Sequence, residues 1–183
     1  MRAEIAEAVT GLLHGIDPAK SARSLSDAEK RRLVELAVFV VTARSPVERD
    51  GYSHDVVVMP SPEAPGRLVG SLGALLSGCE AVGADTETAW RIVAKTAWDC
   101  VPDMRQRLLH ALHDKGGQKR AALVELTGIP DTTCRRTLED LALLELVEQS
   151  KAGNHDTAAW QYRMVDDVSA RWPTSPDTSG GDI

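Results

Sequence analysis

The sequence predicts a mostly helical protein, in which an N-terminal bundle of helices precedes two short helices and a small β-hairpin. Three observations favour this fold class. Apolar residues recur at helical spacing along most of the chain. Only one Phe occurs in 183 residues, so the core must come mainly from Leu, Val and Ala, a composition that suits helices. Near the C-terminus, turn residues separate two short runs of strand-forming residues.

The length allows one large domain or two small ones. We divide the chain into a helical domain at 1–101, a second domain at 102–168 and a disordered tail at 169–183, which is rich in Pro, Ser, Gly and Asp. No apolar run approaches the roughly 18 residues that span a bilayer, so we expect no membrane association. The three cysteines lie far apart, as in a reduced protein, and the chain opens without a signal-peptide pattern. We therefore expect a cytoplasmic protein.

The first two helices follow from apolar spacing and a cap. The first is predicted at 2–16 with one inward face. Ser26 and Glu29 have the spacing of a capping box, which starts a second helix that ends near Arg44. The inward face of the first helix is predicted to comprise Ile5, Val9, Leu12 and Leu13.

The next segment, 45–65, holds four of the nine prolines and is predicted to be irregular, with one short strand at 55–59. A third helix is predicted at 64–82, and Asp85 is predicted to cap a fourth. Another helix is expected to begin beside Pro102 and to open the second domain.

The second domain continues with two short helices joined by a tight turn. Gly128 is expected to end the first of them in the left-handed conformation. Pro130 cannot continue that helix, and Asp131 or Thr132 is expected to cap the next one. The first of these helices turns three apolar residues inward: Leu123, Val124 and Leu126.

The helix after the turn has two distinct faces. Cys134, Leu138 and Leu141 fall on one apolar stripe that faces a core. Short polar residues and two arginines lie off that stripe at the helix N-terminus. They are Thr132, Thr133, Arg135 and Arg136.

A β-hairpin is predicted after this helix, with strands at 146–149 and 159–164. The connecting turn carries three residues suited to contact a phosphate backbone: Lys151, Asn154 and His155. Trp160 is expected to pack the hairpin onto the helices.

The run TGIPDTTCRRTLEDLALLELVEQ at 127–149 resembles the winged helix-turn-helix domains of bacterial transcription regulators. Cys134 stands where valine is common, and Glu145 stands where glycine is usual before the hairpin. The resemblance implies that the protein binds double-stranded DNA, with the helix after the turn in the major groove. The residues then expected to contact bases are Thr132, Thr133, Arg135 and Arg136. Phosphates are expected to be held by Lys119 and Arg120, and the hairpin is expected to contact the DNA through Lys151, Asn154 and His155.

The charge distribution limits how tightly such a protein binds DNA. The net charge of the chain is −6. Residues 104–163 are the only part without a net negative charge, with nine basic and eight acidic side chains. Because few phosphates are neutralised, non-specific affinity should be weak. Specific binding then requires a homodimer or a partner domain. The same domain used only for protein contact remains a further alternative.

The N-terminal half also resembles, over 26–101, the lid region that follows the nucleotide-binding core in some AAA+ ATPases. That resemblance implies that Arg67 contacts nucleotide phosphates, with Arg44 and Arg49 as lesser candidates. The chain lacks a Gly-x-x-x-x-Gly-Lys-Ser/Thr loop. The alternative is therefore a C-terminal fragment of a larger ATPase that acts in DNA replication or mobile-element maintenance.

No catalytic, metal or cofactor site is predicted. His110 and His113 lie three residues apart, but no further ligand stands at a typical spacing, so we interpret both as surface or interhelical residues. No Gly-x-Ser-x-Gly elbow is present. We expect neither an enzyme nor a bound cofactor.

Overall fold

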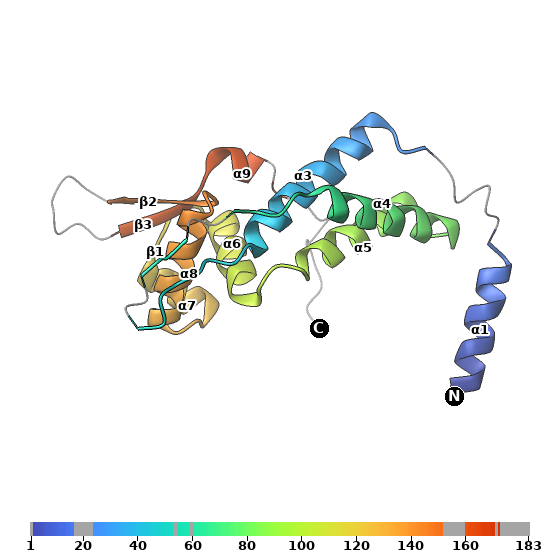
Figure 1. The fold of residues 1–183 in the computed structure, drawn as a ribbon, viewed down its shortest axis with the longest axis horizontal. Coiled ribbons are helices and arrows are strands. Elements are labelled where there is room, and N and C mark those ends of the chain that lie inside the picture. The colour runs from blue at the N-terminus through green and yellow to red at the C-terminus, as the bar shows by residue number, and fades with distance from the viewer. Residues whose placement is uncertain are drawn as a thin grey trace.

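The computed structural model describes residues 2–16, 24–52, 55–58, 61–151, 160–170 and 172. The chain is mostly helical, with a small three-stranded antiparallel sheet near its C-terminus. This confirms the predicted fold class. The molecule is elongated, with the sheet at one end and the helical bundle toward the other (Figure 1).

The bundle consists of three helices that pack against one another: α3 (Asp27–Arg44), α4 (Gly66–Ala81) and α5 (Thr86–Trp98). Both predicted caps are confirmed. The Ser26 amide donates to the Glu29 carboxylate at 2.8 Å, and the Asp85 side chain accepts from the Thr88 amide at 2.9 Å. These hydrogen bonds from Thr88 also lower the pKa of Asp85.

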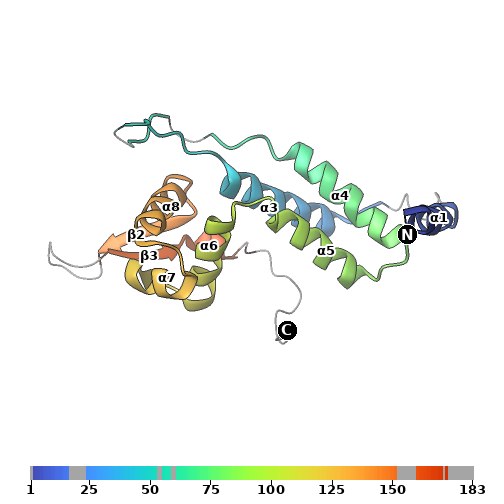
Figure 2. The same cartoon turned by 90° about the horizontal axis from the view of Figure 1, so that it is seen from below.

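The first helix, α1 (Arg2–His14), does not join this bundle, and none of its residues is buried. In Figures 1 and 2 it lies apart from the other helices. The prediction of an inward face was therefore wrong. Apolar spacing identifies one side of a helix but does not supply a surface to cover it. The four side chains of that face are 48–58% exposed: Ile5, Val9, Leu12 and Leu13.

The C-terminal half alternates helices and strands around a second part of the core. The sheet order is β1-β3-β2, and both pairings are antiparallel. Helices α6, α7 and α8 contact one another, and each of them also contacts the sheet. The elements are α6 (Asp103–Lys115), β1 (Gln118–Lys119), α7 (Arg120–Thr127), α8 (Asp131–Leu143), β2 (Val147–Lys151), β3 (Trp160–Met164) and α9 (Asp166–Ala170).

In the described residues of the proline-rich connection between α3 and α4 no strand forms, so the prediction of a strand at 55–59 was wrong. An isolated bridge joins Arg49 to Val56, and the Val57 amide donates to the Glu48 carbonyl at 2.9 Å. The segment folds back on itself and does not pair with the C-terminal sheet. Met59 lies outside the described residues.

Buried contacts join the bundle to the C-terminal half. Arg105 on α6 is 8% exposed, and its guanidinium donates to the carbonyls of Ala43 at 2.8 Å and Ser45 at 2.7 Å. Nearby, the side-chain amide of Gln106 donates through Nε2 to the Trp98 carbonyl at 2.7 Å. One apolar cluster runs through both halves, from Leu33 to Met164.

Part of the predicted tail is placed by the fold. Ser169 belongs to α9, and the Trp172 ring stacks on His113 with ring centroids 4.3 Å apart. The Trp172 ring also meets Phe39 and Trp98 edge-on or tilted. Residues 173–183 lie outside the described part of the chain.

Helices α4 and α8 end in the same hydrogen-bonded motif with different residues. After α4, Gly83 has φ +91°, and the Ala84 amide donates back to the Cys79 carbonyl at 3.0 Å. After α8, Glu145 has φ +57°, and the Leu146 amide donates to the Leu141 carbonyl at 3.0 Å. Such an end usually carries glycine in the left-handed position. Among the described residues Glu145 is the single non-glycine with positive φ.

Candidate nucleic-acid interface

The turn between α7 and α8 aims α8 outward. Gly128 has φ +67°, in the left-handed region, and its amide donates to the Val124 carbonyl at 2.9 Å. Ile129 is then buried at 2% exposure and anchors the turn to the core. Pro130 occupies the N-cap position, where its carbonyl accepts from the Cys134 amide at 2.8 Å. The turn predicted from Gly128 and Pro130 is therefore confirmed.

The prediction that Asp131 or Thr132 caps α8 was wrong, because α8 has no side-chain cap. Asp131 is the first helical residue, and its carboxylate pairs with Arg120 on α7 at 2.8 Å. The acidic side chain still lies in the first turn, where the helix dipole favours negative charge.

Helix α8 shows the two faces that its sequence predicted. Cys134, Leu138 and Leu141 are fully buried at 0% exposure. Burial raises the pKa of the Cys134 thiol, which favours its uncharged form in the core. On the other face, Thr132 and Arg135 are exposed and Thr133 and Arg136 are half-buried.

Acidic side chains pair with two of the predicted DNA-binding arginines. Besides Arg120 with Asp131, Arg135 donates to the Glu139 carboxylate at 2.6 Å, one helical turn further along α8. In contrast, neither Arg136 nor exposed Lys119 forms an ion pair or side-chain hydrogen bond with any described residue. Sequence spacing hinted at the pairing within α8, whereas the Arg120–Asp131 pair depends on the turn.

Of the three hairpin residues that were predicted to contact DNA, the structure describes only Lys151. Lys151 lies opposite Trp160 in the β2–β3 register, with its ammonium 5.7 Å from the ring centroid. Trp160 is 47% exposed, so the prediction that it packs the hairpin onto the helices was wrong. Its ring lies instead beside Lys151, where the two strands adjoin their connection. Asn154 and His155 lie outside the described residues.

A third basic side chain on the hairpin was not predicted. Arg163 on β3 pairs with Glu148 on the neighbouring strand at 2.8 Å and with Asp166 at 2.9 Å. Arg163 and Glu148 lie directly opposite in the register, which is the signal that would have identified this pair.

The C-terminal half of α8 is held by two arginines from outside the helix. Arg49 donates to the Asp140 carboxylate through Nε at 3.2 Å and through Nη2 at 2.6 Å. Arg105 approaches the same carboxylate at 3.4 Å. Arg49 also lies 3.5 Å from Glu139. These contacts join α8 to the segment after α3, and a separation of 91 residues left no sequence signal for them.

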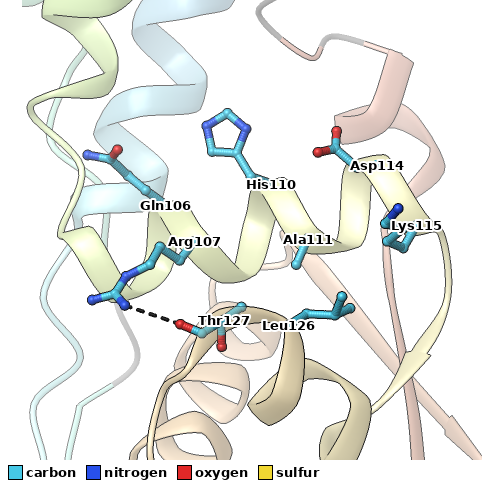
Figure 3. A pocket seen from close by; sticks show the side chains of 8 residues that line it. All are labelled: Gln106, Arg107, His110, Ala111, Asp114, Lys115, Leu126 and Thr127. Atoms are coloured by element: carbon cyan, nitrogen blue, oxygen red, sulfur yellow. Dashed lines mark hydrogen bonds between the residues drawn. The ribbon is translucent and has the colours of Figure 1, made fainter. Parts of the chain in front are cut away.

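A pocket lies between α6 and α7 (Figure 3). It has a volume of about 370 Å³, with Ala111 and Leu126 among its apolar lining. Arg107 closes one end by donating to the Thr127 carbonyl at 3.2 Å. His110 borders the pocket, and desolvation by the neighbouring packing lowers its pKa.

The two histidines of α6 belong to an aromatic contact. The His110 ring lies 4.7 Å from the ring centroid of Trp98, and His113 stacks on Trp172. Within the described part of the chain, no group of three or more His, Cys, Asp or Glu side chains is arranged to hold a metal ion.

Arg67, the candidate nucleotide contact, is exposed in the first turn of α4 in the bundle. Arg44 pairs with Glu63, and Arg49 is engaged with α8 as described above. Helix α4, which carries Arg67, lies in the bundle, apart from α7 and α8, which carry most of the described residues of the DNA-binding set (Figure 2).

No protein-family model matches the chain, and no curated protein matches it as a relative. Across the described ranges, no helix has both the length and the apolar content needed to cross a bilayer.

Proposed function

We propose that the protein binds double-stranded DNA in a sequence-specific manner, as a winged helix-turn-helix regulator of bacterial type. The observation that carries the proposal is the division of α8 into two faces. One face is anchored in the core at 0% exposure, and the other presents Thr132 and Arg135 at the N-terminal end. Regulators of this class place the N-terminal residues of such a helix against base edges in the major groove.

The remaining basic residues extend this face on both sides. Lys119 and Arg120 lie at the start of α7, where their charges suit phosphates. The β2–β3 hairpin projects past the helices (Figure 1), and Lys151 is the last residue of β2, next to the connection between the strands. Asn154 and His155, which the sequence predicts to contact the DNA backbone, lie outside the described residues.

The ion pairs on this face predict a modest affinity of each chain for DNA, and therefore binding as a homodimer to two half-sites. DNA must displace Asp131 from Arg120 and Glu139 from Arg135 before either arginine binds it. Each exposed pair costs only about 0–1 kcal/mol to open, so binding remains possible. With so few free cations per chain, a homodimer on a two-fold symmetric site is the expected binding species.

The decisive experiment compares two arginine substitutions of equal charge. Arg136→Ala removes a predicted base contact, and Arg91→Ala removes an exposed arginine from α5 in the bundle. Binding to a site selected from a random duplex pool is measured by fluorescence anisotropy. We expect Arg136→Ala to weaken it by about 5- to 150-fold, since a bidentate base contact contributes about 1–3 kcal/mol. Equal losses in both variants would refute the assigned face.

A second candidate is protein contact through the same surface. One observation favours it: Asp131 and Glu139 neutralise two of the arginines on this face. Under this alternative, the parent protein gives no mobility shift with random or selected duplex even at low salt. A shift that weakens steeply as salt rises supports DNA binding instead.

A further inference from the structure

Glu139 lies between two arginines that come from different parts of the chain. Its carboxylate is 2.6 Å from Arg135, on the proposed DNA-contacting side of α8. It is also 3.5 Å from Arg49, in the segment that follows α3. Both guanidiniums are partly shielded, with side-chain exposures of 46% for Arg135 and 20% for Arg49, so the carboxylate is shared within a half-buried cluster.

Arg49 is itself held firmly. Its Nε and Nη2 both donate to Asp140. Asp140 is in turn approached by Arg105, which is fixed to the backbone carbonyls that end α3. A continuous row of contacts therefore leads from the interior through Arg49 and Glu139 to Arg135.

We propose that Glu139 determines specificity for the DNA binding proposed above, and that Arg49 positions it. This inference rests on that proposed function. In the free protein, Glu139 accepts a hydrogen bond from Nη1 of Arg135, a donor that a guanine edge or a phosphate would otherwise take. A duplex must therefore replace this carboxylate in order to bind.

The replacement discriminates between duplexes. A bidentate contact with guanine favours binding by about 5- to 150-fold, which exceeds the roughly 2-fold cost of opening an exposed i,i+4 pair. A non-cognate duplex offers Arg135 only a screened phosphate contact, which offsets less of that cost and leaves the carboxylate close to the DNA. Glu139 therefore penalises the wrong sequence more than the right one.

Arg49 determines how strongly Glu139 competes with DNA for Arg135. Its positive charge draws the carboxylate toward the C-terminal half of α8 and away from Arg135. Without Arg49, the full negative charge of Glu139 faces Arg135 and the approaching DNA. Arg49 acts as a positioning residue through Glu139 and needs no contact with DNA.

The test is a double-mutant cycle with the full chain. Parent, Glu139→Gln, Arg49→Gln and the double variant are titrated with the selected duplex and with a random duplex of equal length, at several salt concentrations. We expect Glu139→Gln to tighten binding to the random duplex by about 3- to 10-fold and to the selected duplex by less. The ratio of the two affinities then falls by at least about 2-fold.

Two controls separate this role from general charge effects. Glu125→Gln removes an exposed carboxylate from α7, and Arg49→Lys keeps the charge beside Glu139. Arg49→Gln should weaken binding in the parent background by more than in the Glu139→Gln background, and Arg49→Lys should restore most of the loss. Urea unfolding of each variant confirms that it is folded.

Three outcomes overturn the inference. One is an unchanged affinity ratio in Glu139→Gln, another is an equal change of that ratio in Glu125→Gln, and the third is an Arg49→Gln effect that is the same in both backgrounds. If the parent binds neither duplex, the proposed function itself fails, and the parent titration alone reveals that before any variant is compared.

Discussion

Replacing Glu145 by glycine should stabilise the protein, although it removes a side chain from the turn that leads into the hairpin. Glu145 has φ +57°, and its amide donates to the Ala142 carbonyl at 3.0 Å in the motif that ends α8. Its side chain is exposed and pairs with no described residue, so the substitution removes no ion pair or hydrogen bond of that side chain.

The size of the effect follows from two opposing terms. A non-glycine residue in the left-handed region costs about 1–2 kcal/mol, because its Cβ crowds the carbonyl oxygen. Glycine removes that crowding but loses about 0.5–1 kcal/mol more backbone entropy on folding. The expected gain is about 0.5–1 kcal/mol, which corresponds to a rise in Tm of about 1–4 °C for a chain of this length.

The same motif at the end of α4 provides the matched comparison. Gly83 has φ +91°, and an added Cβ would meet no atom within 4 Å, so any cost of Gly83→Ala comes from the backbone. Gly83→Ala should lower the free energy of unfolding by about 1 kcal/mol, while Glu145→Ala leaves it nearly unchanged. Urea unfolding followed by Trp fluorescence measures all three variants. A lower stability for Glu145→Gly than for the parent would refute the reasoning.

Three further predictions test the packing. Leu12→Asp on α1 should change the free energy of unfolding by less than about 0.5 kcal/mol, whereas Leu76→Ala in the bundle core should lower it by about 2–5 kcal/mol; similar losses would contradict the isolated placement of α1. Arg105→Met should cost about 2–4 kcal/mol, since two buried carbonyls lose their donor, and a neutral result in urea unfolding would disprove the junction. Desolvation by neighbouring side chains lowers the pKa of His110, although part of the residue stays exposed. The unfolded chain therefore binds a proton at His110 more readily than the folded one. The stability that neutral His110 contributes is present above pH 6.5 and is lost as the pH falls below that value. His110→Gln should therefore reduce the fall in stability between pH 7 and 5, and an unchanged pH profile would count against this assignment.

Most local signals in the sequence were reliable guides to the fold, although the cap predicted at Asp131 or Thr132 was wrong. The capping box at Ser26, the cap at Asp85 and the left-handed Gly128 each depend on a few neighbouring residues, and the structure has all three. The buried stripe of α8 was equally accessible, because its period sets its inward face. Even the departure at Glu145 marked the backbone position that proves strained.

Features that depend on distant partners were out of reach. The apolar face of α1 has the pattern of a packed helix, yet no element of the described bundle covers it. The pairing of Arg49 with Asp140 and Glu139 joins segments that only the tertiary fold brings together. The strand at 55–59 failed for the same reason, because β-propensity requires a neighbouring strand to pair with.

Selection of bound sequences from a random duplex pool tests the central claim most directly. The account predicts one enriched motif, arranged as an inverted repeat with half-sites about 10 base pairs apart, as a two-fold dimer requires. The double variant Arg135→Ala, Arg136→Ala should remain folded and enrich nothing, because both side chains lie on the outer face of α8. A parent protein that enriches no sequence, or a double variant that enriches the same one, would contradict the claim.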